Sequence, residues 1–126
     1  MNWTIFAVIV VVFLALQVTR ALGSLKEEDA LKYLDAGAVV IDVRTPAEFA
    51  NKSIPGVINI PLDQLADRIA EVVPEKEQIV LLHCRSGNRS GHGTKVLKSM
   101  GYESTYNLGS FGHAARIMES RPVPAN

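Results

Sequence analysis

The chain has only one cysteine, Cys84, so no disulfide can form within it and bridges give no clue to the redox compartment. It also lacks an excess of charge, because 13 basic side chains balance 13 acidic ones. Without a basic surplus or cluster, we expect no nucleic-acid partner. The three histidines show no ligand-like spacing, so we expect no metal site and no other cofactor. Structural or solvent roles are expected for His83 and His92.

Charged side chains are absent before Arg20, and residues 5–16 are apolar without a break. A segment that is apolar on every face is hard to bury in so small a domain. As a helix, the 19 residues before Arg20 would be about 28 Å long, close to the thickness of a bilayer's hydrocarbon core. We therefore predict a transmembrane anchor within residues 1–23, in contact with the membrane through residues 3–19.

The charges after the apolar run predict the orientation of this anchor. Arg20 and Lys26 both follow it, so the positive-inside bias places the next domain in the cytoplasm, attached to a single-pass helix. The alternative is a cleaved signal peptide, because residues 21–23 offer a cleavage-like pattern of small residues. The domain would then be periplasmic or secreted. A signal peptide normally begins with positive side chains, which are missing here.

The rest of the chain alternates compact β-branched runs with helical patterns. The runs at 38–43 and 78–83 predict buried strands, 104–108 predicts a third short strand, and 57–60 is a possible short extended piece. Helices are predicted from Ser24, where Glu27 completes capping-box spacing, over 61–73, before Gly101, and over 109–120, with a short helical turn after Pro46. This order predicts one α/β domain over residues 24–121, a small and mainly parallel sheet flanked by helices, and a tail at 122–126.

Cys84 comes directly after a predicted strand and starts the loop "CRSGNRSG". Ligands of parallel α/β sheets bind at the carboxyl ends of the strands. A glycine-rich loop that leads into a helix presents free amide N–H groups, which can bind an anion and lower the pKa of a thiol. A free cysteine in mid-strand would more often be a small buried hydrophobe. The position of Cys84 at a strand end favours an activated thiol.

These residues resemble the single-domain sulfurtransferases of the rhodanese family over about Leu25 to Glu119. The six-residue loop from Cys84 to Arg89 matches the family's active loop, and "IDVRTPAEF" matches its strand end with Asp42, Arg44, Glu48 and Phe49. The stretch "SIPGVINIP" matches a third motif, although Lys52 and Ser53 replace the usual Gly-His pair and Val57 a common alanine. Phe111 lies close to the place of the family's C-terminal tryptophan.

The resemblance implies sulfur transfer through a persulfide on Cys84, from thiosulfate or a persulfide donor to a thiol, a protein thiol or cyanide. It implies that the donor binds to the loop residues Arg85, Ser86, Gly87, Asn88 and Arg89. The two arginines favour thiosulfate or a protein persulfide over mercaptopyruvate. Asp42 and Arg44 are expected to be structural and to tie strand ends together.

Two other functions remain open. A cysteine phosphatase or arsenate reductase also has a cysteine, a glycine-rich loop and an arginine, but Cys-x5-Arg phosphatases need the arginine six positions after the cysteine. Ser90 occupies that position, and Arg89 comes one residue early. The second alternative is a non-catalytic, membrane-tethered binding module of rhodanese-like fold. Inactive family members usually lack the cysteine, and this chain keeps it.

Overall fold

A four-stranded parallel sheet forms the centre of the domain in the computed structural model, which describes residues 2–121, without the side chains of residues 17–22. The strands are β1 (Val39–Asp42), β2 (Ile58–Asn59), β3 (Val80–His83) and β4 (Thr105–Gly109). They lie in the order β2-β1-β3-β4, and every pair is parallel. The predicted α/β fold is confirmed, while the predicted tail at 122–126 lies outside the described residues.

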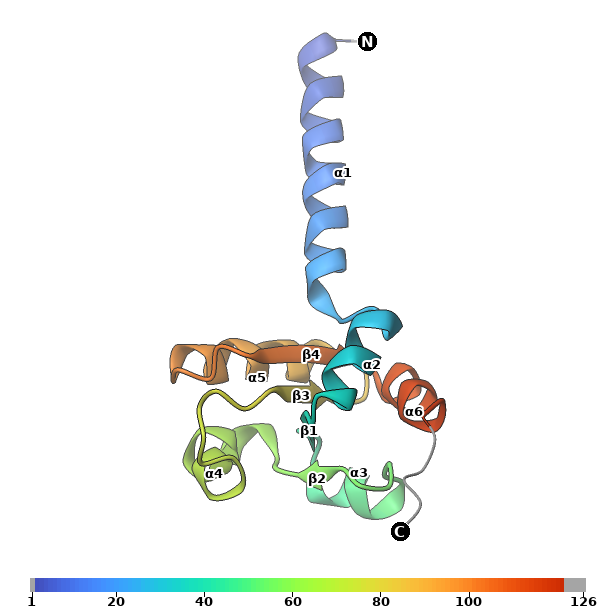
Figure 1. Ribbon diagram of the computed structural model, residues 1–126. Coiled ribbons are helices and arrows are strands. Elements are labelled where there is room, and N and C mark those ends of the chain that lie inside the picture. The colour runs from blue at the N-terminus through green and yellow to red at the C-terminus, as the bar shows by residue number, and fades with distance from the viewer. Residues whose placement is uncertain (1, 122–126) are drawn as a thin grey trace.

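Helices cover both faces of the sheet (Figure 1). The helices α2 (Glu27–Asp35) and α6 (Phe111–Glu119) pack on one face. The other face is covered by α4 (Leu65–Val72), which follows a 3-10 turn at Leu62–Gln64, and by α5 (Asn88–Ser99). Because side chains alternate along a strand, Val40 packs with α2 and α6, whereas its neighbour Ile41 packs with α4. Burial on both faces explains why the central strands β1 and β3 are mainly apolar runs in the sequence.

The predicted capping box at Ser24 and Glu27 is wrong. Helix α2 begins at Glu27, and no side chain caps it. Ser24 is extended, and the next amide, that of Leu25, donates to the carbonyl of Asn107 on β4 at 2.8 Å. This contact holds the segment against the sheet edge, so it cannot form a first helical turn. The capping box lies instead at Thr45 and Glu48, at the start of α3 (Pro46–Asn51).

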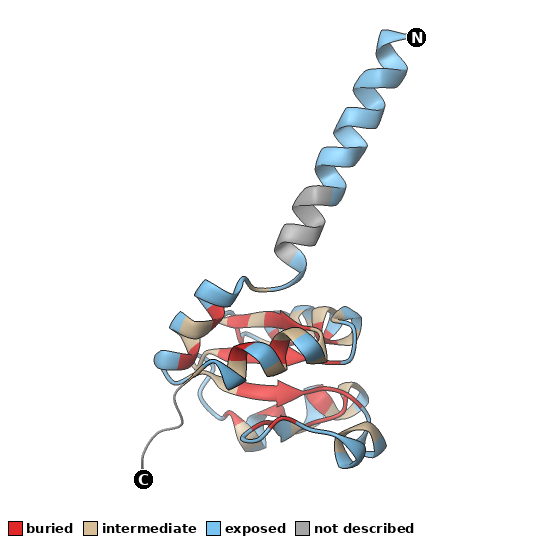
Figure 2. Cartoon of the chain, turned by 90° about the vertical axis from the view of Figure 1, so that its right-hand side faces the viewer, coloured by how far each residue is buried: buried red, intermediate tan, exposed pale blue. Residues whose placement is uncertain are grey.

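The N-terminal residues form one long helix, α1 (Trp3–Gly23), which extends away from the domain (Figure 1). Its described apolar side chains are exposed (Figure 2). No helix in the described part of the chain is both long and apolar enough to cross a membrane, so the predicted transmembrane anchor is not supported. The unbroken apolar run at 5–16 would rise roughly 18 Å, short of a hydrocarbon core of about 30 Å. The predicted helix length of about 28 Å was counted over all 19 residues before Arg20, which include polar residues at both ends of the apolar run.

Candidate active site

Cys84 lies at the carboxyl end of the central strand β3, where the chain leaves the sheet. Its amide still donates to the carbonyl of Gly109 at 3.1 Å, after a register shift between Leu82 and His83. The next residues turn back at once, because α5 begins at Asn88. The turn needs a left-handed residue, which is Gly87 with φ of 98°. A short loop between a parallel strand and a helix therefore holds the thiol, as the sequence predicts.

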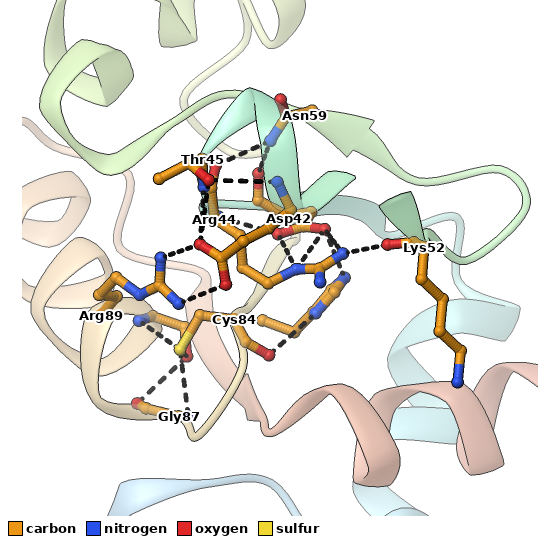
Figure 3. Close-up of polar contacts among 11 residues, drawn as sticks. Asp42, Arg44, Thr45, Lys52, Asn59, Cys84, Gly87 and Arg89 are labelled. Atoms are coloured by element: carbon orange, nitrogen blue, oxygen red, sulfur yellow. Dashed lines mark hydrogen bonds and ion pairs between the residues drawn. The ribbon is translucent and has the colours of Figure 1, made fainter. Parts of the chain in front are cut away.

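The Sγ atom of Cys84 is enclosed by hydrogen-bond donors of this loop. The amide of Gly87 lies 3.0 Å from Sγ, and the amide and hydroxyl of Ser90 each lie 3.4 Å from it. Figure 3 shows the sulfur inside the curve of the loop, with a dashed line to Gly87. All three groups can donate to the sulfur, so they favour a negatively charged sulfur over a neutral thiol.

These contacts determine the charge state of the thiol. Burial of Cys84 by itself raises the pKa, because a thiolate loses hydration. The hydrogen bonds from the hydroxyl and amide of Ser90 and from the amides of Gly87 and Ser86 act in the opposite direction. Together they outweigh burial and hold the pKa of Cys84 below its ordinary value. The reactive thiolate is thus present at lower pH than in a free cysteine.

Arg89 makes a bidentate ion pair with Glu48, from the start of α3. Its two terminal nitrogens lie 2.6 and 3.0 Å from the two carboxylate oxygens. Glu48 is already held by Thr45 through the capping box. The hydrogen bonds from Arg89 lower the pKa of Glu48 to about 2. The pair is therefore charged at neutral and mildly acidic pH, and it is lost only as the pH falls towards 2.

A buried ion pair lies beneath the loop. Asp42 accepts from the backbone amide of Arg44 at 2.8 Å and from its guanidinium at 2.7 to 3.1 Å. The same guanidinium donates to the carbonyl of Lys52 at 2.6 Å (Figure 3). It also lies 4.7 Å from the ring centre of Phe111. The pair thus ties the end of β1 to the segment after α3 and to α6.

His83 lies beside this pair and is fully buried. Its Nε2 atom is 3.8 Å from the carboxylate of Asp42 and has no hydrogen-bond partner among the described residues. Burial lowers the pKa of His83, and the nearby charge of Asp42 opposes this shift only in part. The imidazole is therefore neutral at physiological pH. A neutral, buried ring is consistent with the structural role predicted for it.

The structure brings together only some of the predicted loop residues around the sulfur. Gly87 contacts Sγ directly, and the amide of Ser86 contributes to its lowered pKa. The side chain of Arg85 is exposed, and its carbonyl accepts from the amide of Phe111 at 3.1 Å. Asn88 is exposed and starts α5. Arg89 lies at the site but is paired with a carboxylate.

Three residues at the site were not predicted to act there: Glu48, Ser90 and Asn107. The Thr-x-x-Glu spacing at Thr45 is a capping-box signal that could have placed Glu48 at a helix start. Its pairing with Arg89, 41 positions away, depends on the tertiary fold. Ser90 could have been inferred from its place in the first turn of a helix that follows the thiol. No sequence signal identifies Asn107.

A groove of about 970 Å³ runs beside the loop, between α5, β4 and the segment after α1. The loop residues Ser86, Gly87 and Asn88 form one end of it. Lys95 and Lys98 of α5 line one wall, and Asp29 of α2 lies among the other lining residues. The groove is larger than a small inorganic anion requires, so an extended group could lie next to the loop.

The fold and the loop define a class: a small parallel α/β domain that holds a single thiol in a cradle of amides at a strand end. Residues 26–111 match the rhodanese-like domain family, and this span is well over half of the chain. The chain belongs to the rhodanese-like domain family. The predicted family is thus confirmed.

Known relatives include sulfurtransferases. The chain is 41% identical over 69 residues to thiosulfate sulfurtransferase PspE of Escherichia coli. The matched residues cover 55% of this chain and 66% of the relative. The chain is 34% identical over 82 residues to thiosulfate:glutathione sulfurtransferase of Saccharomyces cerevisiae, covering 56% and 59%. The chain thus spans less than two thirds of either relative's length. A solved structure of a rhodanese with anions from E. coli superposes with a TM-score of 0.59 at 36% identity, covering 61% of this chain and 91% of that one.

Proposed function

We propose that this protein is a sulfurtransferase that carries a sulfane sulfur as a persulfide on Cys84. The observation that supports this most strongly is the set of three donors directed at Sγ, from Gly87 and Ser90. They stabilise a sulfur anion through hydrogen bonds that the loop itself supplies. The thiosulfate sulfurtransferase among the relatives supports thiosulfate as the donor.

The reaction consists of two displacements at sulfur. In the first, the thiolate of Cys84 attacks the outer sulfur of thiosulfate, and the S–S bond of the donor breaks. The bonding electron pair leaves with sulfite, and the enzyme keeps a persulfide anion. In the second, an acceptor thiolate or cyanide attacks the terminal sulfur, and the electron pair of that S–S bond returns to Cys84. The two half-reactions give ping-pong kinetics.

The loop has the same role in both steps. Negative charge moves from Sγ to the terminal sulfur of the persulfide, which points into the curve of the loop. Amides that face this position stabilise the charge by fixed dipoles, as in an oxyanion hole. The loop ends at the first turn of α5, and the positive end of this helix dipole adds to the field. The protein thus contributes a preorganised electrostatic environment.

Arg85 and Arg89 are proposed to bind the sulfonate end of the donor by charge-assisted hydrogen bonds. Arg85 is exposed, whereas both terminal nitrogens of Arg89 are occupied by Glu48. A donor that binds to Arg89 through these two N–H groups must therefore compete with the carboxylate, which leaves the other three N–H groups of the guanidinium unused. Glu48 would in this way limit donor affinity, and its displacement would be part of donor binding.

We predict that Glu48→Gln lowers the KM for thiosulfate by up to about fivefold, because a partly exposed ion pair is worth at most about 1 kcal/mol. The neutral amide releases Arg89 for the donor, and kcat changes little. Steady-state kinetics with cyanide as acceptor measure both constants. Glu71→Gln is the matched control, since Glu71 is an exposed carboxylate that pairs with Arg68 at 4.0 Å. A higher KM for Glu48→Gln would show that Glu48 instead positions Arg89 for the donor.

The sulfur acceptor is proposed to be a thiol, either a small molecule or a protein. The name of the yeast relative specifies glutathione for that protein. In this chain, the groove beside the loop has room for an acceptor larger than cyanide. A peptide-like thiol could lie along α5 and present its sulfur to the loop.

The location of the domain in the cell also stays a proposal. If α1 anchors the chain in a membrane, Arg20 and Lys26 after the apolar run place the domain in the cytoplasm. Cleavage within residues 21–23 would instead give a periplasmic or secreted domain. In either case, the exposed apolar side chains of α1 must be shielded from water by a membrane or a partner, or removed by cleavage.

Mass spectrometry of the intact protein tests the proposed function. After treatment with thiosulfate, the protein should gain the mass of one sulfur atom, and cyanide should remove it with formation of thiocyanate. If the protein gains no sulfur although it is folded, the non-catalytic binding module becomes the better account. Release of phosphate from a phosphate ester, without any gain of sulfur, would favour the phosphatase.

A further inference from the structure

Asn107 on β4 connects the two residues that contact the sulfur of Cys84. Its Oδ1 atom accepts from the hydroxyl of Ser90 at 2.7 Å, and its Nδ2 atom donates to the carbonyl of Gly87 at 3.1 Å. Both partners themselves donate to Sγ. Asn107 is buried, and it comes from a different strand than the loop. Its side chain therefore contacts the cradle from outside without touching the sulfur.

The orientation of this amide group is determined by its other contacts. The backbone N–H of Gly109 donates to Oδ1 at 2.9 Å, and the carbonyl of Gly23 accepts from Nδ2. An exchange of oxygen and nitrogen would place Nδ2 against the N–H of Gly109 and Oδ1 against two carbonyl oxygens. All three contacts would then be repulsive. The oxygen of Asn107 must therefore face Ser90.

The hydroxyl of Ser90 has one proton and three acceptors in reach. Asn107 Oδ1 lies at 2.7 Å, the carbonyl of Gly87 at 3.1 Å and Cys84 Sγ at 3.4 Å. Next to a neutral thiol, the proton can go to Asn107, and Ser90 accepts from the S–H group. Next to a thiolate or persulfide, the proton turns to sulfur. Asn107 Oδ1 then keeps the N–H of Gly109, so no buried acceptor is left without a donor.

Gly87 needs the same support for a different reason. Its left-handed conformation, with φ of 98°, directs its N–H towards Sγ and its C=O towards Asn107. A glycine has the largest choice of backbone conformations, so a hydrogen bond to its carbonyl removes much of the freedom that would move its N–H. Together with the amide of Gly91, which donates to the same carbonyl at 3.0 Å, the contact to Asn107 fixes this residue from the side away from the sulfur.

We propose that Asn107 is a positioning residue for sulfur transfer: it holds the Gly87 peptide and the Ser90 hydroxyl where they stabilise an anionic sulfur on Cys84. The part of this proposal that concerns sulfur transfer rests on the proposed function. The positioning itself concerns the thiolate, which exists without any donor or acceptor. Its test therefore needs no turnover.

The test is the pH dependence of Cys84 alkylation by iodoacetamide in the full chain. We expect Asn107→Ala to raise the midpoint of the pH profile by about one unit, because a thiolate loses stabilisation when its donors are no longer held in place. The matched control is Thr105→Val. Thr105 is a buried residue of the same strand whose hydroxyl donates to the carbonyl of Tyr102 at 2.7 Å, away from the loop. This variant should leave the midpoint unchanged even if it lowers stability.

A second variant shows whether Asn107 acts through Ser90. Ser90→Ala should also raise the midpoint, and the double variant should raise it by less than the sum of the two single shifts, since both changes remove the same held hydroxyl. If Asn107→Ala does not fold, Asn107→Asp, which is nearly isosteric, is measured in its place. There the oxygen that replaces Nδ2 repels the Gly87 carbonyl, and the added negative charge also raises the midpoint.

An unchanged midpoint in the folded Asn107 variant would overturn the proposal, as would fully additive shifts for Asn107 and Ser90. Equal shifts for Asn107→Ala and Thr105→Val would do the same, because the effect would then come from general loosening. Failure of the proposed function looks different. In that case the wild-type protein gains no sulfur from thiosulfate, while the alkylation midpoints still differ as described.

Discussion

Cys84→Ser is expected to gain no sulfur from thiosulfate and to lose at least about 10³-fold in the rate of thiocyanate formation. A hydroxyl cannot form a persulfide, and its oxygen is a far weaker nucleophile than a thiolate at neutral pH. The substitution changes one atom in a buried position, so the fold should persist. Loss of activity can then be assigned to the sulfur.

Intact-mass measurement and an assay of thiocyanate give the two readouts for this variant. The matched control is Ser99→Ala, which removes an exposed hydroxyl that donates within α5, at the end of the helix away from the loop. It should take up sulfur like the wild-type protein. Sulfur uptake by Cys84→Ser would mean that another group carries the sulfur, and the account of the site would be wrong.

The second large effect is expected for stability. Arg44→Met should destabilise the protein by about 3–5 kcal/mol, because it leaves the carboxylate of Asp42 buried without its cation. Asp42 is fully buried, and the neighbouring His83 is neutral and offers no compensating charge. Chemical denaturation with urea measures the change.

The control for this prediction is Arg68→Met. Arg68 pairs with Glu71 at 4.0 Å with both side chains exposed, so its loss should cost at most about 1 kcal/mol. The double variant Asp42→Asn with Arg44→Met should recover part of the lost stability, since no buried charge remains. A change below about 1 kcal/mol for Arg44→Met alone would contradict the assigned role of the buried pair.

The position of the thiol could be predicted from the sequence because it depends on local patterns. The unbroken apolar run before Cys84 indicates a central parallel strand, and the glycines after it indicate a tight turn into a helix. The order of strand, loop and helix then determines where the backbone amides of the loop lie relative to the sulfur. The same reasoning placed β1 and α6, whose bounds in the structure agree closely with the predicted ranges.

The contacts around the loop could not be predicted, because they join residues far apart in the chain. Arg89 was expected to be free for the donor, but the fold places Glu48 of α3 directly against it. Asn107 contacts the loop from β4 because the parallel register brings the ends of β3 and β4 together. Similarly, Ser24 satisfies a capping-box pattern, but the sheet edge holds the segment in another conformation.

The central claim is that the loop stabilises an anionic sulfur on Cys84, and the pH dependence of its alkylation in the wild-type protein tests this most directly. The donors from Gly87 and Ser90 predict that the thiolate forms at lower pH than in a free cysteine, so the alkylation midpoint should lie below that of a free cysteine measured under the same conditions. A midpoint at or above that of a free cysteine would show that burial outweighs the loop, and would contradict the account.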